Sequence, residues 1–191
     1  MRDNVVVLCT GRCGSQVFIK ACSHMTNFTA GHETLTRELG EGRLAWPTRH
    51  IEADNRLVWF TGKLDREWGD KPFYVHLTRD SEKVAASYRD RTMISFGVVT
   101  FYSRGILMRI TGTPRHRGPA KAEWAMEMAR DFVETATENI RFFLKDKTAK
   151  MDFSIERAEE LFPVFWNRVG AEGNLESALG EFKDGAKGQV H

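Results

Sequence analysis

The residues best suited to chemistry form the stretch Thr10-Gly-Arg-Cys-Gly-Ser-Gln16. An apolar, β-branched run at residues 5–8 precedes it and is typical of a strand buried on both faces of a sheet. From Ser15 onwards, apolar residues recur at helical spacing. A glycine-bearing turn between a strand and a helix gathers backbone N–H groups around one point, because glycine adopts backbone angles that other residues avoid. The sequence therefore predicts an anion-binding loop.

The spacing within this loop does not fit a Walker A nucleotide site, which reads G-x-x-x-x-G-K-[ST]. Counted from Gly11, the second glycine of that motif falls on Gln16. Val17 and Phe18 then replace the lysine and the Mg²⁺-binding hydroxyl. No metal is therefore expected, and a small P-loop phosphotransferase or kinase is the less favoured alternative. An ordinary strand-to-helix turn without a ligand also remains open.

Arg79 and Ser87 form a second candidate element. Arg79 follows a predicted strand at residues 73–78, where its planar guanidinium could hold a phosphate through two parallel hydrogen bonds. Ser87 lies eight residues later, about two turns into a predicted helix. A solvated ion pair of Arg79 with Asp80 and a helix-packing role for Ser87 are the alternatives.

Together, the two elements resemble the cofactor-binding motifs of sulfotransferases that use 3′-phosphoadenosine 5′-phosphosulfate (PAPS). Residues 10–16 are similar to the 5′-phosphosulfate loop of that family, T-G-R/K-S-G-T/S-T/S, with Cys13 and Gln16 in place of hydroxyl residues. Arg79 and Ser87 match the spacing of its 3′-phosphate element, R-[DN]-P-x-x-x-x-x-S, with Ser81 in place of the proline. A fainter resemblance extends over the long late helix and the C-terminal part of the chain.

The resemblance implies an enzyme that moves a sulfuryl group from PAPS to an acceptor hydroxyl by metal-independent in-line transfer. The PAPS-binding residues it implies are Arg12, Cys13, Gly14, Ser15, Gln16, Arg79 and Ser87. Arg12 would also be catalytic, because its charge would stabilise the leaving oxygen. Glu33, after a predicted second strand, would be the catalytic base, with His32 and His76 as rivals. The partners would be the nucleotide and an unknown hydroxyl acceptor, and a non-catalytic nucleotide-binding module is the alternative.

The order of predicted elements indicates a single α/β domain over residues 1–191, with a P-loop-type parallel β-sheet flanked by helices on both faces. Strands are predicted at residues 5–8, 28–33, 57–61, 73–78 and 150–153. Helices are predicted to begin at residues 15, 81 and 119, and to span residues 154–162, 164–169 and 174–182. Residues 34–56 carry no clear pattern, residues 109–117 form a basic loop that could be a lid, and residues 183–191 could be a loose tail.

Composition narrows the class of protein further. A net charge of +2 over 191 residues does not favour nucleic-acid or membrane-surface binding. No apolar run approaches the roughly 18 residues of a membrane span, so none is expected. The three cysteines all lie within residues 9–22, which does not indicate a disulfide framework. We therefore expect a cytoplasmic setting.

Overall fold

The computed structural model describes residues 3–92, 98–108 and 119–187. The chain divides into two compact units. Unit 1 comprises Met1–Arg79 and Asn139–His191, and unit 2 comprises Asp80–Glu138. The predicted basic loop at residues 109–117 lies outside the described residues.

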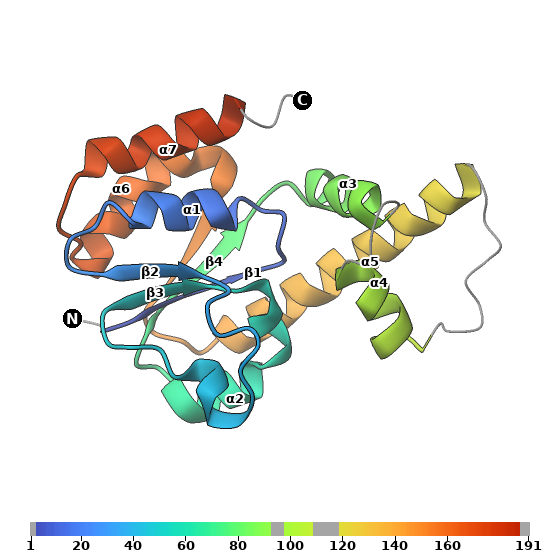
Figure 1. Ribbon diagram of the computed structural model, residues 1–191, viewed down its shortest axis with the longest axis horizontal. Coiled ribbons are helices and arrows are strands. Elements are labelled where there is room, and N and C mark those ends of the chain that lie inside the picture. Colours follow the sequence, from blue (N-terminus) through green and yellow to red (C-terminus); the bar gives the residue numbers. More distant parts are fainter. Residues whose placement is uncertain (1–2, 93–97, 109–118, 188–191) are drawn as a thin grey trace. The chain divides into compact units, whose positions relative to one another are not determined.

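Unit 1 is built on a five-stranded parallel sheet with the strand order β2-β3-β1-β4-β5 (Figure 1). The strands are β1 (Val5–Cys9), β2 (Thr29–His32), β3 (His50–Ala53), β4 (Phe73–Thr78) and β5 (Lys150–Ser154). Every residue of the central strand β1 is buried, and β1 pairs with β3 on one side and β4 on the other. The chain leaves β1 towards β2 on one side and leaves β4 towards β5 on the other, so the carboxyl ends of β1 and β4 form the switch point at which open α/β sheets bind ligands.

Helices cover both faces of this sheet (Figure 1). On one face lie α1 (Ser15–Cys22), α6 (Ala158–Val169) and α7 (Leu175–Lys187), and on the other lies α2 (Thr61–Trp68). Phe18 of α1 packs edge-on against Phe153 of β5, with 5.0 Å between the ring centroids. The predicted α/β class, a parallel sheet with helices on both faces, is therefore confirmed, and the assignment of the whole chain to one sulfotransferase-like domain stays a prediction.

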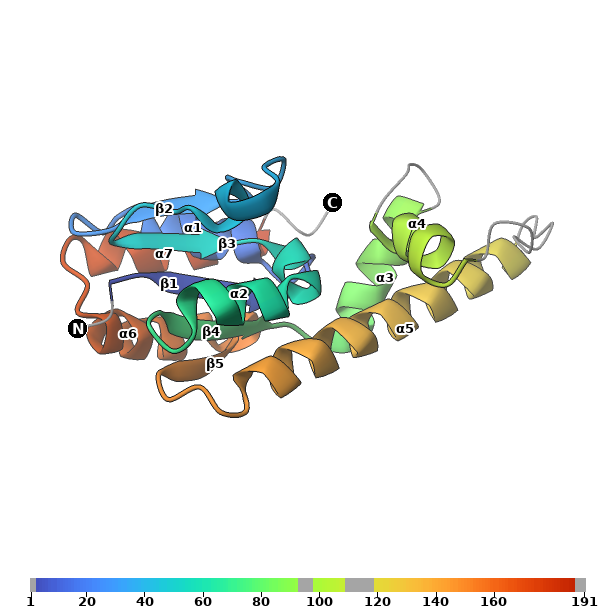
Figure 2. The ribbon, with the colours of Figure 1, turned by 90° about the horizontal axis from the view of Figure 1, so that it is seen from below.

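Unit 2 is helical and contains α3 (Ser81–Thr92), α4 (Val98–Phe101) and most of α5 (Pro119–Leu144). A π-helical turn, Tyr102–Ile106, follows α4. In Figure 2, α3 and α4 lie alongside α5. The packing of unit 2 centres on Phe132 of α5, whose ring centroid lies 5.3 Å from that of Tyr88 and 5.5 Å from that of Tyr102. The predicted start of the long helix at Pro119 is confirmed.

The strand predicted at residues 57–61 is wrong. Residues Asn55–Trp59 form a 3₁₀ helix, and α2 begins at Thr61. The Asp54 carboxylate accepts a hydrogen bond from the Arg56 backbone N–H at 2.8 Å and caps this turn. The third strand of the chain, β3, instead lies within the segment that carried no clear sequence pattern.

The helix break predicted at Pro163 is wrong, because α6 runs through that residue. The N–H donor that the proline lacks is outweighed there by burial of Phe162 and Phe165 on the same helix. Helix α7 extends to Lys187, beyond the predicted end at residue 182, and residues 188–191 of the predicted tail lie outside the described residues.

We predict that Gly14→Ala destabilises unit 1. Gly14 has a φ of +88°, and an added Cβ would lie 2.7 Å from Ile155 Cγ1. The left-handed backbone should cost about 1–2 kcal/mol and the overlap about 1–3 kcal/mol, measured by urea unfolding.

Gly180→Ala is the matched control. Gly180 lies in α7 with open space around it, so the added methyl should stabilise the helix by about 1 kcal/mol. Adding Ile155→Ala to Gly14→Ala should remove the overlap penalty and leave the backbone penalty. A Gly14→Ala protein as stable as the unaltered one would contradict the close approach of Ile155, the residue after β5, to the loop.

Candidate functional site

The loop after β1 has a left-handed backbone at three of its residues. The φ angles are 79° at Gly11, 57° at Arg12 and 88° at Gly14. Such turns direct successive N–H groups into one concavity, which is a general anion-binding arrangement. Because Arg12 has a side chain, its positive φ angle is strained. Its side chain is exposed at the surface.

Cys13 supports the loop from inside. Its side chain is fully buried. A hydrogen bond with the Cys9 side chain lowers the pKa of the Cys13 thiol, and N–H groups of the loop act in the same direction against the effect of burial. The same contact, together with burial, raises the pKa of Cys9. Cys13 therefore lies inside the protein. In the 5′-phosphosulfate loop motif that residues 10–16 resemble, the same position carries a hydroxyl residue.

Arg79 lies against this loop. It follows β4, the neighbour of β1, and its Nη1 donates a hydrogen bond to the Arg12 carbonyl oxygen at 3.3 Å. A guanidinium from the end of one strand and the N–H groups after the adjacent strand thus meet at the switch point. Two of the residues predicted from separate motifs are brought together here.

The end of β2 supplies His32 and Glu33. His32 Nε2 lies 3.0 Å from the hydroxyl of Ser15, the first residue of α1. Glu33 has a φ of 56° and forms an ion pair with Arg56, with 2.7 Å between Oε2 and Nη1. Its backbone N–H donates to the Ala53 carbonyl at 3.0 Å. Of the two, His32 contacts the anion loop directly, and Glu33 faces a cation from the segment after β3.

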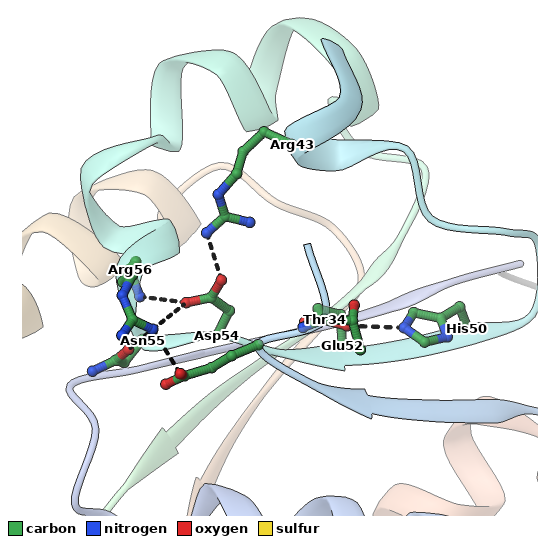
Figure 3. A network of polar contacts seen from close by, with 8 residues as sticks. Thr34, Arg43, His50, Glu52, Asp54, Asn55 and Arg56 are labelled. Atoms are coloured by element: carbon green, nitrogen blue, oxygen red, sulfur yellow. Dashed lines mark hydrogen bonds and ion pairs between the residues drawn. The ribbon is translucent and has the colours of Figure 1, made fainter. Parts of the chain in front are cut away.

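A buried polar network lies beneath these residues and was missed by the sequence reasoning (Figure 3). The Arg43 guanidinium pairs with the Asp54 carboxylate at 2.5 Å, and both side chains are almost fully buried. Next to them, the Glu52 carboxylate accepts hydrogen bonds from the backbone N–H and the hydroxyl of Thr34. His50 Nε2 is 2.9 Å from the same carboxylate. Through Thr34, the network fixes the chain directly after Glu33.

The other predicted residues, apart from Gly14, are His76, Gln16 and Ser87. His76 is buried within β4 with its Nδ1 3.1 Å from an Asp152 oxygen, and burial lowers its pKa. Gln16 is exposed in the first turn of α1. Ser87 is half-buried on α3 in unit 2, and its contact with the 3′-phosphate stays a prediction.

Two kinds of feature, a metal-binding cluster and a membrane-spanning helix, are absent from the described part of the chain. Residues 3–92, 98–108 and 119–187 contain no group of three or more His, Cys, Asp or Glu side chains arranged to hold a metal ion. Within the same ranges, none of the helices has the length and apolar character needed to cross a membrane.

We predict that Arg43→Met destabilises the protein by about 3–5 kcal/mol, because it leaves the buried Asp54 carboxylate without its cation. Arg66→Met, at an exposed position of α2, is the control and should change the free energy of unfolding by less than about 0.5 kcal/mol. Equal stabilities of the two variants in urea unfolding would contradict a structural role for the Arg43–Asp54 pair.

Comparison with known proteins finds similarity at the level of structure. No protein-family model matches the chain, and no curated protein matches it. Among solved structures, the chain is similar to a sulfotransferase domain from the curacin biosynthetic pathway, with a TM-score of 0.60 and 11% sequence identity. The match covers 94% of this chain and 77% of that domain. The similarity shows that the two share a fold.

Proposed function

We propose that the protein is a PAPS-dependent sulfotransferase of the cytoplasm that transfers a sulfuryl group to a hydroxyl acceptor. The observation that carries the proposal is the contact of Arg79 with the carbonyl of Arg12. It joins the two motifs that resemble the phosphosulfate and 3′-phosphate elements of that family. The shared fold with a sulfotransferase domain supports the same assignment.

The packing of α1 disfavours the phosphotransferase alternative. Phe18 occupies the place of the Mg²⁺-binding hydroxyl of a Walker A motif. Its ring is fully buried and contacts Phe153 and Phe162, with centroids 5.0 and 5.7 Å away. Position 18 therefore belongs to the hydrophobic core and offers no oxygen ligand.

Most of these residues would bind the nucleotide, and one would accept the proton of the acceptor hydroxyl. N–H groups of Gly14, Ser15 and Gln16, with the Arg12 guanidinium, would hold the 5′-phosphosulfate and stabilise the negative charge that builds on the leaving phosphate oxygen. Arg79 and Ser87 would hold the 3′-phosphate. As the acceptor oxygen bonds to sulfur and the bond from sulfur to the phosphate oxygen breaks, the hydroxyl proton would pass to Glu33.

The ligand prediction tests the site before any acceptor is known. Adenosine 3′,5′-bisphosphate at a hundredfold excess over its Kd should stabilise the protein by about 2.7 kcal/mol. ATP, which lacks the 3′-phosphate, should have a much smaller effect in the same thermal-shift experiment. Arg79→Met should remove most of this difference, whereas equal shifts in the unaltered protein would contradict recognition of the 3′-phosphate.

Turnover then separates the enzyme from its alternatives. With labelled PAPS and a panel of hydroxyl acceptors, label transfer should persist in excess EDTA, since the loop and Arg12 supply the positive charge. Loss of activity in EDTA and recovery with Mg²⁺ would instead support phosphoryl-type chemistry. Bisphosphate binding without transfer to any acceptor would support the non-catalytic binding module.

Glu33→Gln tests the base. The amide keeps the shape and removes the basicity, so kcat should fall by about 10²–10⁴ while bisphosphate affinity in calorimetry stays within about twofold. His76→Gln is the control, because His76 is buried within β4 and its Nδ1 contacts the Asp152 carboxylate. Normal turnover by Glu33→Gln together with loss of activity in His32→Ala would move the role of base to His32.

A further inference from the structure

The Ser15 hydroxyl is held by His32, a residue from a different part of the sheet. Ser15 begins α1, whereas His32 ends β2, and β3 separates β2 from β1 in the sheet. Ser15 is only 8% exposed. No side chain caps α1 at Gly14, and the Ser15 oxygen instead lies 3.0 Å from His32 Nε2. The contact therefore sets the direction of a hydroxyl at the centre of the anion loop.

The effect of this contact depends on which of the two groups, the Ser15 hydroxyl or the His32 ring, donates the proton of the hydrogen bond. A hydroxyl has one proton to donate and two lone pairs to accept with. If Ser15 donates to His32, it presents only lone pairs to an anion in the loop, which is repulsive. If His32 Nε2 carries the proton and donates to Ser15, the hydroxyl proton is free for the anion. Among the described residues, none hydrogen-bonds His32 Nδ1, so the protein does not fix the opposite tautomer.

We propose that His32 is a positioning residue that acts through Ser15 on the leaving 5′-phosphate, and is not the base for the acceptor hydroxyl. With its proton on Nε2, His32 donates to the Ser15 oxygen, and Ser15 donates to a phosphate oxygen. The chain of two hydrogen bonds orients and strengthens the donation by Ser15. This inference rests on the proposed function, because it needs a phosphate group in the loop.

A double-mutant cycle on the full-length protein tests it. The Kd of adenosine 3′,5′-bisphosphate is measured by calorimetry for the unaltered protein, Ser15→Ala, His32→Ala and the double variant. Ser15→Ala should raise the Kd about tenfold and His32→Ala about fivefold. The double variant should stay near tenfold, because His32 acts only through Ser15. His32→Gln, whose amide can donate to Ser15, should recover most of the affinity.

The matched control is His24→Gln, in which the altered histidine pairs with Glu181 at the other end of α1 and should leave the Kd unchanged. Multiplicative effects of the two single substitutions would overturn the inference. So would a His32→Ala protein that binds normally and turns over slowly, which is the behaviour of a base. Absence of bisphosphate binding by the unaltered protein would reject the proposed function itself.

Discussion

The left-handed backbone of the loop after β1 is the constraint on which the candidate site depends. Gly11, Arg12 and Gly14 all adopt positive φ angles within five residues of a fully buried strand. Ile155 packs so closely against Gly14 that a Cβ there would overlap it. The packing of Ile155, the residue after β5, and the shape of the anion loop therefore depend on each other. A side chain at Gly14 would cost stability and would also move the N–H groups.

The strand ends around this loop carry more charge than a hydrophobic sheet can hold without compensation. Glu52 and Asp54 are fully buried, and an unpaired buried carboxylate would cost several kcal/mol. Each carboxylate has specific partners: Thr34 and His50 for Glu52, and Arg43 and the Arg56 N–H for Asp54. The contacts of Thr34 fix the backbone directly after Glu33, which favours a defined direction for its side chain.

The sequence predicted the parts whose physical signal is local. The apolar run of β1, the glycine turn and the helical spacing of α1 are each visible within a few residues, and all three are present in the structure. β3 was missed because two of its four residues, His50 and Glu52, are polar, although all four residues are buried. Their side chains bond to Thr29 and Thr34, and the His50 backbone N–H donates to the Asn4 side-chain oxygen; all three partners lie far away in the sequence. The alternation of polar and apolar residues in β3 was the signal that could have identified it.

His76 and Glu33 have different surroundings, and this difference bears on which of them could accept a proton. His76 is buried on Asp152, and burial lowers its pKa, so proton transfer there would require a charge inside the sheet. The Glu33 carboxylate pairs with Arg56 at a half-exposed position, where such a pair contributes only about 0–1 kcal/mol. In the proposed reaction, an acceptor hydroxyl would therefore replace Arg56 as the partner of Glu33 at little cost. A weak ion pair orients the carboxylate without holding it tightly, which is the arrangement that the proposed base requires.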